Sequence, residues 1–283
     1  MAVFPRRHLS DRDPGRPCTG RHPLVIAHRG ASGQAPENTL AAVRAAAAGA
    51  HAVEGDVHRT RDGQLVVIHD LHLRRTTDAV RVFPTRAPWL VADFDQAELA
   101  RLDAGSWFAP HWAGATIPTL HDWAAAAAPA RLLVEVKHPR RYPGIEHDLV
   151  AALHRGALRA AVRAQRVTVQ SFDHDWVAAL RVLEPAFPVG LPESRPTGRD
   201  LDHAAWFAQQ VNPAVRVADA TLVRQAQDRG LEVHLWTADG RRHHRRAVRW
   251  GVDGIITNHP LRLLHCPSCA HPLVETRSLP AAG

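Results

Sequence analysis

Short apolar runs rich in Val, Ile and Leu recur along the chain, and Ala-rich stretches able to form helices lie between them. Strands of a parallel sheet are buried on both faces, so they read as continuous apolar runs. Eight such runs are expected to be strands: residues 24–28, 52–57, 131–137, 167–172, 188–192, 210–213, 232–237 and 252–257. Helices are expected at residues 38–48, 145–164 and 219–229. Eight strands that alternate with helices predict an α/β fold, the closed (β/α)8 TIM barrel.

The 283 residues fit one barrel domain, which typically takes about 250 residues. No Pro-, Gly- or Ser-rich break in the interior indicates a second domain. We therefore expect a barrel domain over residues 23–264, a basic, disordered N-terminal tail over residues 1–22 and a C-terminal tail over residues 265–283. No apolar run approaches the roughly 20 residues of a membrane span. Because the N-terminus also lacks the apolar core of a secretory signal, a cytoplasmic location is expected.

The formal net charge of +7, counted with 20 neutral histidines, favours phosphate-bearing partners in general. Nucleic acid is not expected as a partner, because no recognisable nucleic-acid module is present and the basic residues 241–246 fit the solvated face of a helix. The three cysteines, Cys18, Cys266 and Cys269, lie in the expected tails. Cys266 and Cys269 have the spacing of half a zinc knuckle, but a closed zinc site usually needs two such pairs, so free thiols are expected.

One further apolar run, residues 65–69, follows the second expected strand too closely to be its parallel neighbour. A parallel connection needs a dozen or more residues, whereas Asp62-Gly63 is a preferred hairpin turn. The run is therefore expected to be an antiparallel strand. If pairing is symmetric about Asp62-Gly63, paired residue numbers sum to 125 and Asp56 faces His69.

Acids, bases and cations collect at three expected strand ends: His28 with Arg29, Glu54 with Asp56, and Glu135 with Lys137. Side chains alternate along a strand, so Glu54 and Asp56 share one face. The C-terminal strand ends of a (β/α)8 barrel form its active-site face. We therefore expect these side chains to converge.

These residues belong to motifs that closely resemble those of the glycerophosphodiester phosphodiesterase family. The matched motifs in the first part of the chain are His28-Arg29-Gly30, Pro36-Glu37-Asn38-Thr39, Glu54-Gly55-Asp56-Val57, Thr60, Asp62-Gly63 and His69-Asp70. Those that follow are Ile117-Pro118-Thr119-Leu120, Glu135-Val136-Lys137, Gln170-Ser171-Phe172, Trp236-Thr237 and Gly251-Val252-Asp253-Gly254-Ile255-Ile256-Thr257. The resemblance covers residues 25 to about 260, and residues 71–116 correspond to the family's variable insertion after the second barrel strand.

The three carboxylates of Glu54, Asp56 and Glu135 are predicted to hold one divalent cation. Buried like charges are costly without a cation among them, and ligation by oxygen alone suits Mg²⁺ or Ca²⁺. The competing interpretation pairs these carboxylates with Arg29 and Lys137 as structural salt bridges. In the catalytic interpretation, Arg29 and Lys137 bind the substrate phosphate, one as a planar fork and one as a point charge.

His28 and His69 are the predicted general acid and base, because imidazole can both give and take a proton near neutral pH. By resemblance, one activates the attacking oxygen, either water or the neighbouring glycerol hydroxyl, and the other protonates the departing alcohol. His28 is predicted as the acid and His69 as the base.

Four more matched residues are candidates for supporting the metal site or lining the pocket: Glu37, Gln170, Phe172 and Trp236. Capping of the first helix is an equally good interpretation for Glu37, and Asn38 or Thr39 could also be that cap. The chain departs from the family pattern at Asp239, where Asn is usual, and at Asn258, where an acid is common. These departures bear on substrate recognition.

The predicted reaction is metal-dependent hydrolysis of a glycerophosphodiester, such as glycerophosphocholine or glycerophosphoethanolamine, to sn-glycerol 3-phosphate and an alcohol. A lysophospholipase D or phospholipase D-like activity on lipid head groups is the alternative in the same chemistry, and residues 84–90 with Trp89 could then contribute to an apolar groove. A non-catalytic phosphate-binding barrel is the alternative of another class. The sequence leaves open the alcohol, the choice between Mg²⁺ and Ca²⁺, peripheral lipid contact and the oligomeric state.

Overall fold

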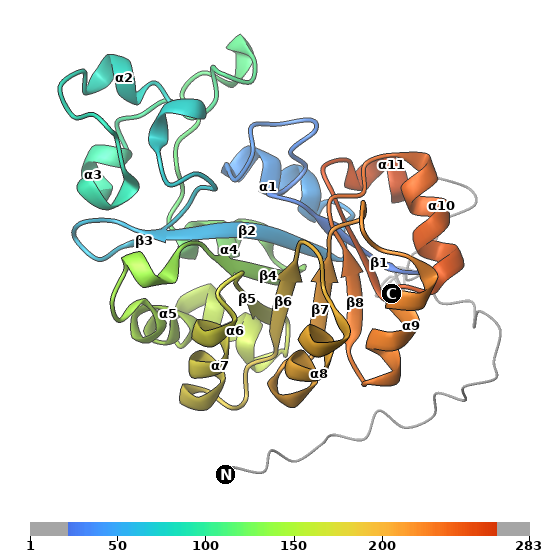
Figure 1. The fold of residues 1–283 in the computed structure, drawn as a ribbon. Coiled ribbons are helices and arrows are strands. Elements are labelled where there is room, and N and C mark those ends of the chain that lie inside the picture. The colour runs from blue at the N-terminus through green and yellow to red at the C-terminus, as the bar shows by residue number, and fades with distance from the viewer. Residues whose placement is uncertain (1–21, 265–283) are drawn as a thin grey trace, which may run out of the picture.

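The computed structural model describes residues 22–264, and its centre is a closed barrel of eight parallel strands (Figure 1). The barrel strands are β1 (Leu24–Ala27), β2 (Ala52–Arg59), β4 (Arg131–Val136), β5 (Val167–Gln170), β6 (Val189–Glu193), β7 (Gln210–Pro213), β8 (Glu232–Leu235) and β9 (Gly254–Thr257). Strand β1 pairs with both β2 and β9, which closes the ring. The predicted TIM barrel is confirmed. Four predicted strands, over residues 24–28, 131–137, 167–172 and 232–237, extend one or two residues too far at their C-terminal ends, whereas β2 is two residues longer than predicted.

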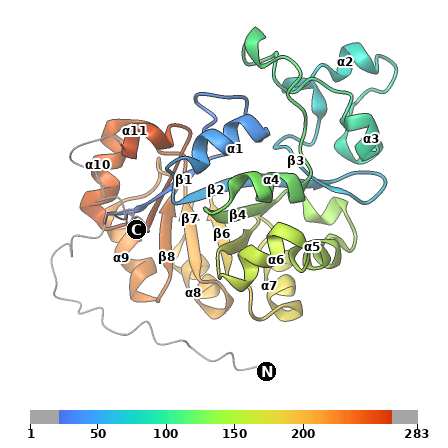
Figure 2. The same cartoon turned by 180° about the vertical axis from the view of Figure 1, so that it is seen from behind.

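Helices surround the barrel on the outside (Figures 1 and 2). They are α1 (Leu40–Ala47), α4 (Leu120–Ala127), α5 (Ile145–Leu153), α6 (Gly156–Arg163), α7 (His174–Leu183), α8 (Gly198–Phe207), α9 (Ala220–Asp228), α10 (Arg241–Trp250) and α11 (Pro260–Leu264). Side-chain oxygens accept backbone N–H groups at the N-termini of five of them: Thr39, Thr119, Asp173, Thr197 and Asp219.

The single helix predicted over residues 145–164 is wrong. The chain forms two helices there, α5 and α6, separated at His154 and Arg155. Gly156, the first residue of α6, adopts a left-handed φ of 48°. That conformation interrupts a helix and suits glycine, which has no Cβ. The helices predicted over residues 38–48 and 219–229 are confirmed to within two residues at each end.

The hairpin prediction is right in direction and wrong in register. Strand β3 (Leu65–Val67) runs antiparallel to β2, but paired residue numbers sum to 124 rather than 125. The N–H of Ile68, not His69, donates to the carbonyl of Asp56 at 2.8 Å. The turn accounts for the slip: Thr60 pairs with Gln64 across three loop residues, and Gly63 takes the left-handed conformation that such a turn needs (φ 83°).

The segment between β3 and α4 stands out from the barrel beside this hairpin (Figures 1 and 2). It contains η1 (Leu73–Arg75), α2 (Ala79–Val82), η2 (Val91–Asp93), α3 (Gln96–Leu99) and η3 (Pro110–Trp112). A hydrophobic cluster of its own, with the fully buried Leu73, Phe94 and Leu99, packs against Val66 and Ile68 of the hairpin. The segment is thereby fixed close to the C-terminal end of β2.

The basic residues 241–246 lie on α10, where the arginines are exposed and His244 is buried, so the predicted solvated helix face is confirmed. Within residues 22–264, no helix is long and apolar enough to cross a membrane. The predicted tails and the three cysteines fall almost entirely outside the described residues.

Candidate active site

The C-terminal ends of β2 and β4 bring three acidic side chains together. Asp56 on β2 pairs in register with Glu135 on β4, and Glu54 lies two residues earlier on the same face of β2. One carboxylate oxygen from each lies within 4.8 Å of the other two, and all three side chains are buried. The cluster of Glu54, Asp56 and Glu135, called here the acidic triad, could hold a metal ion. The sequence predicted that these three side chains would converge, and in the structure they do.

Two cations border the triad. Nζ of Lys137 lies 3.1 Å from Oδ1 of Asp56 and also pairs with Glu135. Nε of Arg29 lies 3.3 Å from Oδ2 of Asp56. Burial alone would raise the pKa of Asp56, but the charges of Lys137 and Arg29 outweigh burial and lower it. Burial opposes the ammonium form of Lys137, but Asp56 and Glu135 outweigh it and raise the Lys137 pKa.

Glu54 is the triad member with the least compensation. Its Oε2 accepts the backbone N–H of Arg29 at 2.8 Å, whereas its buried Oε1 has no hydrogen-bond partner among residues 22–264. Burial, together with the charges of Asp56 and Glu135, raises the Glu54 pKa well above its ordinary value. A buried carboxylate oxygen without a partner, on a side chain that lies close to two other carboxylates, suits a cation site with protein ligands. The triad therefore fits a hard divalent ion better than a set of closed salt bridges.

Both predicted catalytic histidines lie beside the triad: His28 precedes Arg29, whose N–H donates to Glu54, and His69 follows Ile68, whose N–H donates to the carbonyl of Asp56. Their other contacts differ. Nδ1 of His28 lies 2.7 Å from the amide oxygen of Asn258, whereas Nδ1 of His69 lies 2.7 Å from a carboxylate oxygen of Asp70. Burial and the neighbouring Arg29 lower the pKa of His28 to about 4. His28 is therefore neutral near pH 7.

Glu37 accepts from Arg29 at 2.9 Å and from Arg75 at 2.6 Å, so it bridges two guanidinium groups. Arg75 also binds Asp70, the partner of His69. The cap of α1 is Thr39, whose side chain accepts the N–H of Ala42. Sequence reasoning missed Arg75, because no spacing rule places a residue of the insertion beside a barrel strand end.

Amide side chains orient the carboxylates of the triad. Nε2 of Gln170 donates to Glu135 at 2.9 Å, and Nδ2 of Asn38 donates to Asp56 at 2.8 Å. Asn38 adopts a left-handed φ of 60°, which asparagine tolerates better than most residues and which places it over Asp56. Asn38 was predicted only as a possible helix cap. Its contact with Asp56 depends on tertiary structure.

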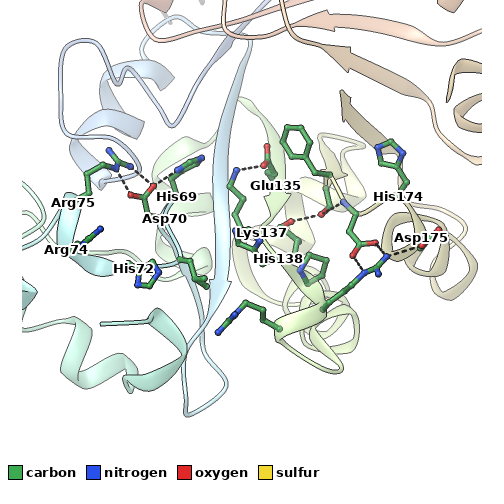
Figure 3. A pocket seen from close by; sticks show the side chains of 18 of the residues that line it. His69, Asp70, His72, Arg74, Arg75, Glu135, Lys137, His138, His174 and Asp175 are labelled. Atoms are coloured by element: carbon green, nitrogen blue, oxygen red, sulfur yellow. Dashed lines mark hydrogen bonds and ion pairs between the residues drawn. The ribbon is translucent and has the colours of Figure 1, made fainter. Parts of the chain in front are cut away.

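A cavity of about 1330 Å³ opens beside these groups, between the insertion and the loops after β4 and β5 (Figure 3). In Figure 3, His69, Asp70 and Arg75 lie together on one side, and Glu135 of β4 and Lys137, directly after β4, lie apart from them across β2. Phe172 is 47% exposed in this cavity, and its ring meets Trp236 edge-on at 5.7 Å between centroids. Residues 84–90, predicted as a possible apolar groove, are not among the residues that line the cavity.

A TIM barrel with an acidic triad, two cations and two imidazoles at its C-terminal strand ends belongs to the class of barrel enzymes that act on phosphate esters. The model of the Glycerophosphoryl diester phosphodiesterase family matches residues 28–262. The chain belongs to this family, and it is an enzyme, a phosphoric diester hydrolase.

Relatives and solved structures agree with this assignment. The chain is 32% identical to a glycerophosphodiester phosphodiesterase of Bacillus subtilis, over 84% of each chain. It is 34% identical to one from Caldanaerobacter subterraneus, over 86% of this chain and 96% of the relative. Among solved structures, an Oleispira antarctica phosphodiesterase in complex with the product sn-glycerol-3-phosphate is similar at a TM-score of 0.73 and 28% identity, covering 85% of this chain and 95% of that chain.

Proposed function

We propose that this enzyme hydrolyses glycerophosphodiesters, such as glycerophosphocholine and glycerophosphoethanolamine, to sn-glycerol 3-phosphate and an alcohol. The observation that carries the proposal is the meeting of the acidic triad, two cations and two imidazoles at one face of the barrel. The product named for the similar Oleispira antarctica structure supports the same substrate class. A single domain over residues 23–264, with residues 71–116 inserted, is part of this proposal. The cytoplasmic location stays a prediction.

Glu54, Asp56 and Glu135 would hold one Mg²⁺ or Ca²⁺ ion, which suits their oxygen-only donor set. When bound, the ion would neutralise charge on the phosphodiester oxygens. Arg29 and Lys137 stand at the edge of the triad and would bind the remaining phosphate oxygens, which stabilises the charge that builds up during bond cleavage.

The hydrogen-bond partners favour roles for the two histidines opposite to those predicted from sequence. Nδ1 of His69 donates to the carboxylate of Asp70, which holds the ring in one orientation with its other nitrogen free to act, and this arrangement suits a general acid that gives its proton to the departing alcohol oxygen. His28, with a pKa of about 4 and an amide partner, is neutral and suits a general base. It would take the proton of the attacking oxygen, which is either water or the neighbouring glycerol hydroxyl.

Trp89 belongs to the core of the insertion rather than to a groove for a lipid. Trp89 packs against the insertion's own hydrophobic cluster and donates its indole N–H to the carbonyl of Phe83 at 2.8 Å. Its ring therefore packs inside the insertion, and on this side the cavity is lined both by polar residues such as His72 and Arg74 and by the exposed apolar side chain of Val80.

A substrate panel tests the proposal. Purified enzyme with Mg²⁺ or Ca²⁺ is expected to release alcohol and glycerol 3-phosphate from glycerophosphocholine, glycerophosphoethanolamine or glycerophosphoglycerol, followed by ³¹P NMR. EDTA, Glu54→Ala and His69→Ala should each abolish the reaction. Release from none of the diesters with either ion would overturn the proposal, and faster release from lysophosphatidylcholine would assign the lipid reaction instead.

A further inference from the structure

His28, Asn258 and Asp239, from three different strand ends, form a chain of hydrogen-bonded side chains. Nδ1 of His28, after β1, lies 2.7 Å from Oδ1 of Asn258, after β9. Nδ2 of Asn258 in turn donates to Oδ2 of Asp239, after β8, at 2.7 Å. The hydroxyl of Ser32 lies 2.8 Å from the same Oδ1 of Asn258. The side chain of Asn258 therefore connects Asp239 to His28 by hydrogen bonds.

Asp239 is itself fixed. Its Oδ1 accepts the backbone N–H of Asn258 at 2.8 Å and the hydroxyl of Thr257 at 2.9 Å. These two bonds leave Oδ2 facing the Asn258 side chain. Because an ionised carboxylate only accepts hydrogen bonds, the Asn258 amide must present its NH₂ group to Asp239. The reverse orientation would bring two oxygens together at hydrogen-bond distance.

The orientation of Asn258 then decides where His28 carries its proton. The Asn258 oxygen that faces His28 can only accept, so Nδ1 of His28 must be the donor. In the neutral ring the lone pair is then on Nε2, which becomes the nitrogen able to take a proton.

We propose that Asp239 and Asn258 are positioning residues that hold neutral His28 in its Nδ1-protonated tautomer, so that Nε2 is the basic atom. Only the expected effect on kcat rests on the proposed function. The tautomer follows from the hydrogen-bond chain. The other charged groups that act on His28 are Arg29, Asp56 and Lys137, and none of them replaces the bond at Nδ1.

Asp239→Asn is the first test, because it changes neither His28 nor Asn258. The Oδ1 of the new amide can still accept from Asn258 N–H and from Thr257, but its NH₂ group now faces the Asn258 side chain. Asn258 should therefore turn its oxygen toward residue 239 and its NH₂ toward His28, which reverses the tautomer. We expect the ¹⁵N spectrum of the His28 side chain, assigned with a His28→Gln sample, to change from Nδ1-protonated to Nε2-protonated. We expect kcat to fall about 10- to 100-fold at nearly unchanged KM.

The double variant Asp239→Asn/Asn258→Asp is the second test. An amide at position 239 can donate to a carboxylate at position 258, whose other oxygen accepts from Nδ1 of His28. The Nδ1-protonated tautomer should return, and kcat should recover relative to Asp239→Asn. A merely structural role for Asp239 would make the double variant worse than the single one. If the single variant fails to fold, the tautomer of His28 in the double variant still tests the proposal.

Asp219→Asn, the same change at the N-cap of α9, is the matched control and should leave the His28 spectrum and kcat unaltered. The proposal is overturned by an Nε2-protonated His28 in the wild type, by an unchanged tautomer in Asp239→Asn, or by a double variant no better than the single one. The NMR result needs no turnover, so a wild type with the expected tautomer but no activity on the substrate panel would refute the proposed function alone.

Discussion

Replacing Glu54 by Gln should remove ion binding and leave the free energy of unfolding of the ion-free protein nearly unchanged. The Glu54 carboxylate lies within 4.8 Å of those of Asp56 and Glu135. At an effective dielectric constant of about 20, each such contact between two negative charges costs about 3.5 kcal/mol. Burial and this repulsion raise the pKa of Glu54 well above its ordinary value, so they favour the protonated side chain when no ion is bound. A glutamine amide resembles that protonated side chain.

The ion-dependent part of the stability should then disappear. At an ion concentration about 100 times Kd, binding to the folded state adds about 2.7 kcal/mol. For a domain of this size, that raises Tm by roughly 5 to 11 °C. Differential scanning fluorimetry with EDTA, and with Mg²⁺ or Ca²⁺, should show this rise in the wild type. Glu54→Gln should lose most of it, because a neutral amide does not balance the charge of the ion.

Glu193→Gln is the matched control. Glu193 ends β6, and burial raises its pKa as well, but it lies outside the acidic triad. This variant should keep the full rise in Tm. The reasoning is refuted if saturating ion raises the Tm of Glu54→Gln as much as that of the wild type. An ion-free Glu54→Gln that unfolds more than roughly 10 °C below the wild type would also refute it.

Three further outcomes are expected. Because the ion displaces the proton of Glu54, ion affinity measured by titration calorimetry should rise about 10-fold per pH unit up to the raised pKa, and a flat profile would contradict this. Burial lowers the pKa of His58 to about 4, so the stability it contributes is present above pH 6.5 and is lost as pH falls toward 4. In urea unfolding, His58 should contribute a loss of about 3 kcal/mol over this range, alongside the loss from His28, and His58→Gln should remove the His58 part. Lys137→Met should lower kcat/KM about 10²- to 10³-fold. Arg140→Met, on the exposed wall of the same cavity, should lower it far less, and equal losses would contradict the assigned phosphate contact.

The barrel and the position of the acidic triad could be predicted from sequence because both follow from periodicity. Runs of Val, Ile and Leu indicate strands buried on both faces, and alternation along β2 puts Glu54 and Asp56 on one side. Strand ends of a barrel meet at one face, so Glu135 could be added without knowledge of any contact. These inferences need only local pattern and one topological rule.

Other features could not be read in this way, because they depend on turn geometry or on contacts between distant residues. One extra loop residue in the hairpin shifted the register that faces Asp56. Arg75 meets Glu37 across 38 positions, and Asn258 meets His28 across 230. Periodicity along the chain carries no information about such pairs. The sequence alone determined which chemical groups reach the barrel mouth, whereas the tertiary structure decided which atoms of those groups bind one another, and so where the protons lie.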